Sequence, residues 1–298
     1  MGFKQVATAL TVGVMAVVAL PSLAAAASST QVIIQEDVAR QPENSTPTKN
    51  WVEYFRTAVS EASFRVGPSE PPLNTGSMEL TTPTGGDKIT VFNFDHVGTE
   101  LSDIDAMKYS TYRSAGSAQQ DAAINIQVDF NGAAVGGFTT LVFEPVYNTD
   151  QGAVTSGAWQ DWDAYNGGNA IWWSSNPIPS APNRDTFVSW DTIMSANPGA
   201  TILGGYGVNQ GSGNPGLTTA VDALALGVSG DTVTYDFEAQ RVAATSKDQC
   251  KNEGYKNFST EYKNQGDCVS AIASDGKAKG NPKPAESPMD SFLRAIGL

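Results

Sequence analysis

The sequence predicts an all-β fold, an antiparallel β-sandwich that is jelly-roll-like, with a small disulfide-stapled helical hairpin near its C-terminus. Two observations carry this prediction. Up to about Gln240, short segments alternate between apolar and polar residues, and glycine, proline and asparagine separate them. Helical periodicity is nearly absent there and begins only afterwards, where both cysteines occur. Short strands with repeated turn signals are typical of sandwiches and jelly rolls.

The clearest strand is the segment 124–130, in which Ile124, Ile126 and Val128 alternate with polar residues. Asn131-Gly132 follows and favours a hairpin turn to a second strand from Phe138 to Val146. Further strands are predicted at Gly76 to Thr82, Lys88 to Phe94, Ala106 to Arg113, Val221 to Val228 and Thr232 to Glu238. One short helix is predicted at Trp190 to Ala196.

The first 27 residues have the form of a secretory signal peptide. Lys4 precedes an apolar run from Val6 to Leu20, Pro21 ends that run, and small residues follow from Ala24 to Ala27. The run is short for a membrane span. We therefore expect a mature protein that begins near Ser28 and is secreted or held at the cell surface.

The remaining chain divides into a sandwich domain over 28–243, a stapled segment over 244–276, a linker over 277–286 and a short amphipathic helix over 287–298. Ser246 with Gln249, and Asn264 with Asp267, have the form of helix caps just before the two cysteines. Cys250 and Cys268 are the only cysteines, so an exported protein is expected to pair them. The last helix is expected to pack on its own sandwich or on a partner protein.

The charge of the chain narrows the class of partner. The formal net charge is −13, and the acidic residues are concentrated in the sandwich region. Such a surface repels phosphate backbones and anionic lipids, so nucleic acid is excluded as an expected partner. No membrane span is expected either, because the apolar run near the N-terminus is short for one. Neutral glycans, cations and basic surfaces stay open.

Aromatic residues next to acids and amides form the candidate binding site. Between positions 159 and 173 lie four of the six tryptophans, and the predicted ligand contacts are Trp159, Trp162, Asp163, Tyr165 and Trp172. Sugars present apolar C–H faces rimmed by hydroxyls, which such residues can bind. Adjacent Trp172 and Trp173 point to opposite faces if they lie in a strand, so at least one of them is expected in the core.

Signals for catalysis or for a cofactor are weaker. His96 is the single histidine, and the glycine-rich run 204–213 lacks the pattern of a phosphate loop, so we interpret it as a strand end and a long turn. Asp129 and Glu144 fall on the two strands of the predicted hairpin and are the candidate acids of a glycan-cleaving enzyme. No organic cofactor is predicted; Asp222 is a candidate calcium ligand.

Several sequence segments resemble known exported proteins. The segments 76–82, 101–104, 137–145, 159–163, 207–209 and 235–238 together resemble uncharacterised exported bacterial β-sandwich proteins similar to jelly-roll carbohydrate-binding modules. The cysteine segments 247–252 and 264–270 are similar to a C-terminal motif of secreted Gram-positive proteins. The resemblance implies a bacterial, exported protein and assigns no catalytic residue.

The function predicted from these observations is that of a non-enzymatic exported module that binds a glycan or a cell-envelope polymer. Two alternatives stay open: a glycan-active enzyme that uses paired carboxylates, and a structural or adhesive surface protein.

Overall fold

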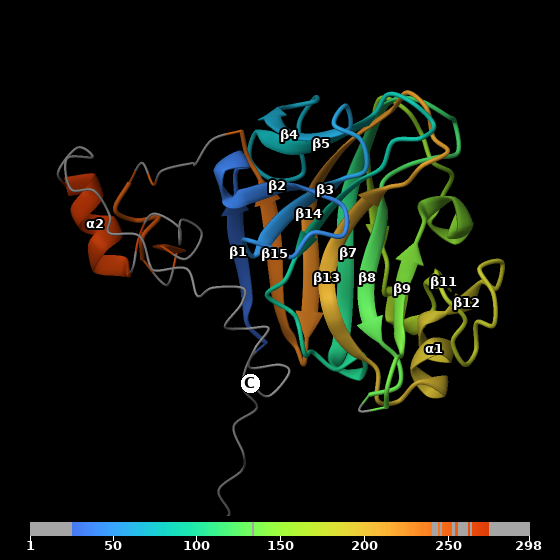
Figure 1. Ribbon diagram of the computed structural model, residues 1–298. Coiled ribbons are helices and arrows are strands. Elements are labelled where there is room, and N and C mark those ends of the chain that lie inside the picture. The colour runs from blue at the N-terminus through green and yellow to red at the C-terminus, as the bar shows by residue number, and fades with distance from the viewer. Residues whose placement is uncertain are drawn as a thin grey trace, which may run out of the picture.

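Two β-sheets packed face to face form the main body of the protein (Figure 1). The computed structural model describes residues 26–132, 134–239, 244, 246–251, 254–255, 262 and 264–273. Its seven-stranded sheet contains β1 (Ser28–Ile33), β4 (Glu61–Val66), β5 (Gly76–Thr82), β7 (Ile104–Ala115), β10 (Trp159–Asp163), β14 (Leu217–Val228) and β15 (Asp231–Phe237). Its eight-stranded sheet has the order β12 (Val188–Ser189), β11 (Ile171–Ser174), β9 (Phe138–Phe143), β8 (Ala123–Asp129), β13 (Thr201–Gln210), β6 (Ile89–Asn93), β3 (Trp51–Phe55) and β2 (Val38–Pro42).

The predicted hairpin is confirmed and shows how the core forms. β8 and β9 pair antiparallel, from Ile124 opposite Phe143 to Asp129 opposite Phe138. Ile124, Ile126 and Val128 are buried, and they belong to one continuous core that residues of both sheets share. Alternation therefore sends these apolar residues inward and leaves the polar residues between them on the outer face of the eight-stranded sheet.

The other predicted strands are also confirmed, as β5, β6, β7, β14 and β15. The predicted helix is α1 (Trp190–Ala196), whose N-cap Ser189 accepts a hydrogen bond from the Thr192 N–H. Within residues 26–239, five short 3-10 helices lie in the connections: η1 (Gln35–Asp37), η2 (Leu101–Asp103), η3 (Pro145–Tyr147), η4 (Thr149–Gln151) and η5 (Asn166–Gly168).

The sheets are mixed, whereas the sequence predicted antiparallel pairing throughout. β1 pairs in parallel with β15, and β2 pairs in parallel with β3. The N-terminal segment adds β1 to the edge of one sheet, turns through η1, and adds β2 to the edge of the other (Figure 1). A strand that no hairpin joins to its neighbour is free to run in either direction, and here it protects an edge of each sheet.

The glycine-rich run contains more strand than the sequence predicted. β13 extends unbroken to Gln210, and the turn begins only at Gly211. Between Ile202 and Tyr206 the register against β8 shifts. Glycine permits this bulge and the close approach of neighbouring strands, so the run belongs to the sheet interior.

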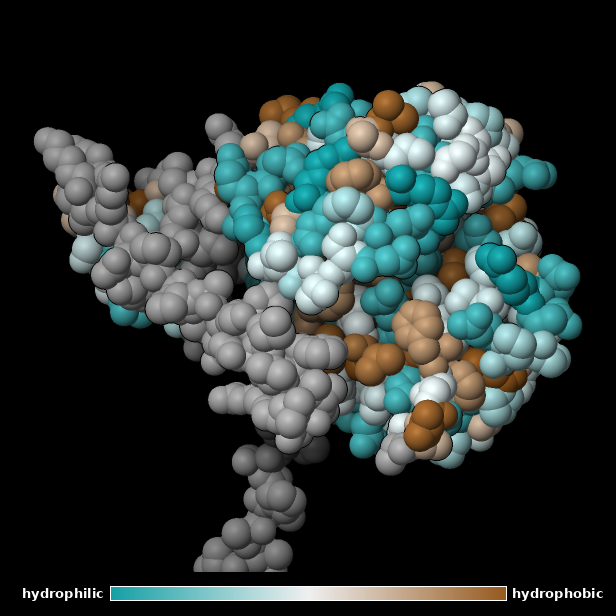
Figure 2. Space-filling model, viewed as in Figure 1, coloured by the Kyte–Doolittle hydropathy of each residue, from teal (hydrophilic) through white to brown (hydrophobic). Residues whose placement is uncertain are grey.

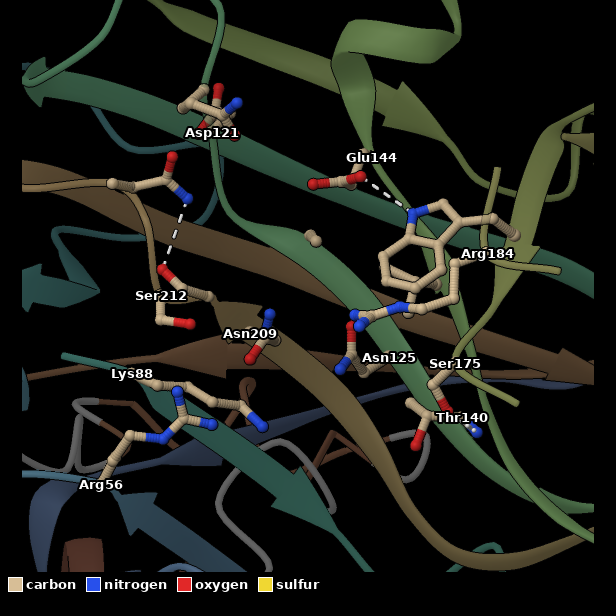
Figure 3. Close-up of a pocket in the computed structure, with 16 residues that line it drawn as sticks. Arg56, Lys88, Asp121, Asn125, Thr140, Glu144, Ser175, Arg184, Asn209 and Ser212 are labelled. Atoms are coloured by element: carbon tan, nitrogen blue, oxygen red, sulfur yellow. Dashed lines mark hydrogen bonds between the residues drawn. The ribbon is translucent and has the colours of Figure 1, made fainter. Parts of the chain in front are cut away.

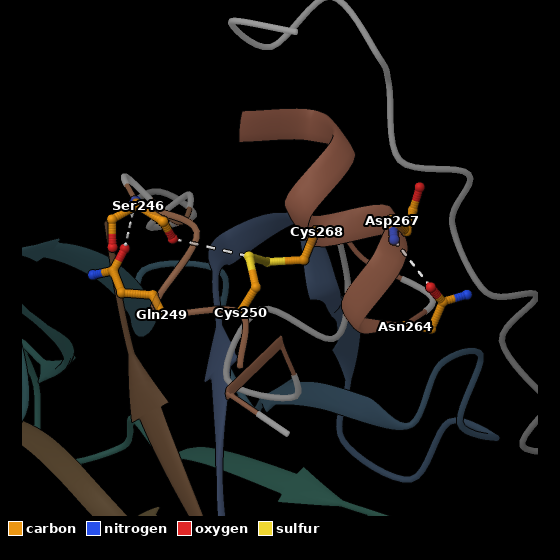
Figure 4. Close-up of a disulfide and its surroundings, with 6 residues drawn as sticks. All are labelled: Ser246, Gln249, Cys250, Asn264, Asp267 and Cys268. Atoms are coloured by element: carbon orange, nitrogen blue, oxygen red, sulfur yellow. Dashed lines mark hydrogen bonds between the residues drawn. A yellow bond between two sulfur atoms is a disulfide. The ribbon is translucent and has the colours of Figure 1, made fainter. Parts of the chain in front are cut away.

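A second, small core lies around the disulfide. Cys250 and Cys268 are bonded, with their Cα atoms 5.8 Å apart, and this confirms the predicted pair (Figure 4). The second cysteine lies in α2 (Gln265–Ala273), which begins after Asn264, whose Oδ1 accepts from the Asp267 N–H. Around the first cysteine, residues 246–251 form a bend and turns and residues 254–255 are in a 3-10 conformation, so in the described residues only the second half of the predicted helical hairpin is an α-helix.

The predicted linker and last helix, and nearly all of the predicted signal peptide, lie outside the described residues. In the part of the chain that is described, no helix is both long and apolar enough to cross a membrane.

Candidate functional site

A cavity of about 270 Å³ opens on the outer face of the eight-stranded sheet (Figure 3). Its lining combines one tryptophan, amide and hydroxyl side chains, two acids and three basic residues. They are Arg56, Lys88, Gln120, Asp121, Ala123, Asn125, Thr140, Val142, Glu144, Trp173, Ser175, Arg184, Asn209, Gly211, Ser212 and Asn214. Hydrogen-bonding groups beside one aromatic ring suit a polar organic ligand.

Strand register explains why these side chains meet. Gly207 of β13 lies opposite Asn125 of β8, Asn125 lies opposite Val142 of β9, and Val142 lies opposite Trp173 of β11. Opposite residues on neighbouring strands point to the same face, so the four positions form one row across the sheet. Gly207 contributes no side chain to this row, because a Cβ atom there would lie 2.0 Å from the Val91 carbonyl oxygen of the neighbouring strand.

Asn125 is the least satisfied polar residue of this row. Its side chain is only 7% exposed, and its Oδ1 atom has no hydrogen-bond partner among the described residues. A buried amide oxygen without a partner costs about 1 to 3 kcal/mol. Such an atom in the floor of a cavity is therefore suited to accept a hydrogen bond from a ligand hydroxyl or from water.

Trp173 forms one wall of the cavity and is held on two sides. Its indole N–H donates to Glu144 Oε2 over 2.8 Å, and the Arg184 guanidinium carbon lies 5.3 Å from its ring centroid. Trp173 is half-buried, while its neighbour Trp172 is fully buried. The ring is thus fixed in orientation and still has surface toward the cavity.

The two acids of the cavity differ in how they are bound. Burial raises the pKa of Glu144 above its ordinary value, and burial also raises the pKa of Asp121 to about 6. Asp121 accepts hydrogen bonds on both oxygens, from the Thr111 hydroxyl (2.7 Å) and from the Ala122 N–H (2.8 Å). Asp121 therefore holds the start of β8 against β7, whereas Glu144 orients Trp173.

Asp129 and Glu144 do not form the predicted catalytic pair. Both lie on the outer face of the hairpin, but Asp129 pairs with Phe138, six residues before Glu144. At about 3.3 Å per residue this separation is about 20 Å. The two carboxyl groups of a glycoside hydrolase lie about 5 to 10 Å apart, so this assignment is wrong.

A second cavity, of about 240 Å³, lies farther along the same face. Tyr54, Phe92 and Phe94 line it and contact one another edge to face at centroid distances of 6.3 to 6.5 Å. Lys88 lines both cavities. The ring of Phe92 fits here because Gly205 lies beneath it, where a Cβ atom would be 2.2 Å from the ring. The outer face thus offers two adjoining hollows.

The predicted site residues are not brought together on one surface. Trp162 and Trp172 are 1% and 0% exposed, and their indole N–H groups donate to Thr111 Oγ1 (2.8 Å) and to the Ala164 carbonyl (2.9 Å). Both belong to the core because their side chains point between the sheets. This burial corrects the assignment of Trp172 as a ligand contact. Trp162 is also buried but lines the cavity of about 460 Å³ next to β10, so a ligand role for Trp162 stays a prediction.

The other three predicted contacts lie around β10, at the seven-stranded sheet. Trp159 packs against Tyr112 and donates to the Pro68 carbonyl. Asp163 Oδ1 accepts from the Tyr165 N–H (3.1 Å), and its Oδ2 lies 3.9 Å from Lys108 Nζ. Asp163 also lines a cavity of about 460 Å³ on that side of the protein. A ligand role for Trp159, Asp163 and Tyr165 stays a prediction.

Asp222, the candidate calcium ligand, is fully buried, and its oxygens accept from backbone N–H groups of Leu73 (2.8 Å) and Phe237 (3.2 Å). Each carboxylate oxygen of Asp222 thus already accepts one backbone hydrogen bond, and a calcium ion at Asp222 stays a prediction. In the described part of the chain, no three His, Cys, Asp or Glu side chains are grouped as metal ligands.

Asn125 and Trp173 were not predicted as site residues, although alternation in the strand 124–130 gave one signal for Asn125. Ile124 and Ile126 were correctly predicted to point inward, which places Asn125 on the outer face. The choice between Trp172 and Trp173 needed the register of β11 against β9, which alternation alone does not supply.

No protein-family model matches the chain, and no curated protein matches it. Among solved structures the chain is similar to a β-1,2-glucanase from Parabacteroides distasonis, with 14% identity and a TM-score of 0.32 over 60% of this chain and 23% of the glucanase. It is also similar to a family 11 carbohydrate-binding module from Clostridium thermocellum in complex with a β-1,3-1,4-mixed-linked tetrasaccharide. That similarity has 10% identity and a TM-score of 0.33, over 67% of this chain and 95% of the module. The chain thus spans less than a quarter of the glucanase.

Proposed function

We propose that this protein is an exported glycan-binding module and that its site is the cavity around Asn125 and Trp173. The observation that carries the proposal is the buried Asn125 amide oxygen, which has no partner among the described residues and lies in the floor of the cavity. A sugar hydroxyl would supply the missing donor.

The rest of the cavity suits the same ligand. The Trp173 ring offers an apolar surface for sugar C–H groups, and the side chains of Thr140, Ser175 and Asn209 add hydrogen-bonding groups. The adjoining hollow with Tyr54 and Phe94 extends the surface along the sheet, which favours an oligosaccharide chain over a single sugar.

Export is part of the proposal. The leader-like sequence 1–27 supports it, and so does the Cys250–Cys268 disulfide, because disulfides persist in oxidising compartments.

A large apolar docking surface is not evident on the described residues of the face seen in Figure 2, which is mostly hydrophilic or neutral with scattered hydrophobic side chains. Glycan binding therefore accounts for this face better than adhesion to a protein does.

Binding of the purified Ser28 to Leu298 protein to a panel of neutral and acidic polysaccharides, measured by affinity electrophoresis and calorimetry, tests the proposal. Asn125→Ala and Trp173→Ala are expected to weaken binding about tenfold or more, since each removes about 1 to 3 kcal/mol of contact. Trp159→Ala is the matched control, because this half-buried tryptophan lies in the other sheet.

Two outcomes would contradict the assignment. Binding that Trp159→Ala abolishes, while Asn125→Ala and Trp173→Ala keep it, would move the site to β10. Binding to none of the polysaccharides would contradict glycan recognition itself. Circular dichroism of each variant confirms that it is folded.

A further inference from the structure

We infer that the glycan bound in this cavity is acidic and that Arg184 recognises a carboxylate on it. The inference rests on the proposed function and names the class of ligand. Its basis is a group of basic side chains around one cavity of a protein whose formal net charge is −13. Arg56, Lys88 and Arg184 come from three separate segments and line the same cavity (Figure 3).

Arg184 is the member of this group whose charge is not paired with an acid. Within the described residues its guanidinium makes no ion pair and no hydrogen bond, and it packs on the Trp173 ring in a cation–π contact. A guanidinium has five N–H donors in a planar fork that matches the two oxygens of a carboxylate. Packing on the indole orients this fork at the cavity wall, so a carboxylate would meet it with little further ordering.

Lys88 and Arg56 form a second basic group on the other side of the cavity. Arg56 Nε donates to Glu43 Oε1 over 2.8 Å, and Lys88 Nζ lies 4.0 Å from Glu43 Oε2. One carboxylate is thus shared between two cations. Burial lowers the pKa of Lys88, and a bound anion would offset that effect.

The acids of the cavity do not cancel these charges at Arg184. Asp121 is buried and uses both oxygens in hydrogen bonds to Thr111 and Ala122. Glu144 binds the indole N–H of Trp173, and neither acid forms an ion pair with Arg184 among the described residues. Among the cations that line the cavity, Arg184 is therefore the one without an acidic partner in the described residues, and its guanidinium is available to an anion.

The test compares polysaccharides that differ only in charge. Polygalacturonate and alginate are each assayed before and after carbodiimide and borohydride reduction of their carboxylates to primary alcohols, together with a neutral mixed-linkage β-glucan and a glycerol-phosphate polymer. Binding to at least one acidic polymer is expected, with a loss of about tenfold or more on reduction.

Variants locate the carboxylate. Arg184→Gln is expected to weaken binding of the acidic polymer about tenfold and to weaken binding of its reduced form much less, because the reduced form has no carboxylate for the guanidinium to bind. Arg65→Gln is the matched control: it removes the same charge from an exposed arginine, which pairs with Glu79 on the other sheet, and should change binding less than about twofold.

The outcomes separate the inference from the proposed function. Equal binding of acidic and reduced polymers, or binding of the neutral β-glucan alone, overturns the inference and keeps glycan binding. Binding of the glycerol-phosphate polymer alone overturns the carboxylate assignment. Equal losses in Arg184→Gln and Arg65→Gln show a general charge effect and also overturn it. Binding to none of these polymers contradicts both.

Discussion

At the scale of single residues, the adjacent tryptophans Trp172 and Trp173 have different roles: one packs in the core and the other lines the proposed binding site. Trp172 is fully buried between Phe143 and Trp190, while Trp173 turns to the outer cavity. The sequence predicted that at least one of the pair would lie in the core. It assigned Trp172 to the ligand, whereas Trp172 is the buried member of the pair. The choice was wrong because one step of register exchanges the faces of every side chain in a strand.

Substitution of these two residues should separate stability from binding. Trp172→Ala leaves a large cavity in the core and is expected to lower the free energy of unfolding by about 3 to 5 kcal/mol. Trp173→Ala, at a half-buried position, is expected to cost about 1 kcal/mol. Urea unfolding followed by circular dichroism measures both. A larger loss for Trp173→Ala would show that the two have been assigned to the wrong faces.

Buried carboxyl groups should make stability depend on pH. Burial raises the pKa of Asp222 to about 7 and that of Asp236 to about 6. A raised pKa means that the folded state binds more protons, so these groups stabilise the fold at acid pH, and that stability is lost as the pH rises from about 4 through 7. Burial lowers the pKa of His96, which has the opposite effect, but Asp222, Asp236 and Asp121 outnumber it.

Unfolding free energies between about pH 4.5 and 7.5 measure this effect, with a slope of up to about 1.4 kcal/mol per pH unit for each titrating group. Asp236→Asn is the informative variant, because its amide oxygen can still accept from Asn74, as Asp236 Oδ2 does. It should flatten the profile. Stability that instead rises from pH 4.5 to 7.5 would show that these acids stay ionised when folded.

At the scale of elements, local sequence patterns predicted the elements that form from residues close together in the chain. Alternation and the Asn131-Gly132 turn identified the β8–β9 hairpin, and the Ser189 cap with its following turn fits α1. The parallel strands β1 and β2 could not be predicted, since their partners β15 and β3 are chosen by long-range packing. The sequence predicts a strand end and a long turn for the glycine-rich run 204–213, whereas β13 continues to Gln210. Its glycines permit close contacts between strands, which no local pattern reveals.

Gly207 tests this role of glycine in β13. A Cβ atom there would lie 2.0 Å from the Val91 carbonyl oxygen, which is backbone and cannot rotate away. Gly207→Ala is therefore expected to cost about 1 to 3 kcal/mol in unfolding free energy. Gly199→Ala is the control, because a Cβ atom there meets nothing within 4 Å. Equal, small effects of the two substitutions would contradict the close approach of β13 and β6.

At the scale of the whole molecule, the described residues form two hydrophobic cores of unequal size. The sandwich core contains residues of both sheets, and the small core contains Ala244, Cys250, Tyr262, Cys268 and Ala271; no residue belongs to both. The sequence predicted a boundary here, because the strand pattern ends near the point where the cysteines begin, and the independence of the two parts stays a prediction. A core this small needs its disulfide, which contributes about 3 kcal/mol for a loop of this length.

Reduction of the disulfide should therefore unfold the small core and leave the sandwich intact. All six tryptophans lie between positions 51 and 190, so tryptophan fluorescence reports on the sandwich alone. Its thermal midpoint is expected to be the same with and without dithiothreitol. Amide hydrogen exchange in α2 should become fast on reduction, because α2 has only nine residues, and isolated helices shorter than about 12 to 15 residues are marginal in water. A tryptophan midpoint that falls by several degrees on reduction would mean that the two cores stabilise each other, and the division of the chain after the sandwich would then be wrong.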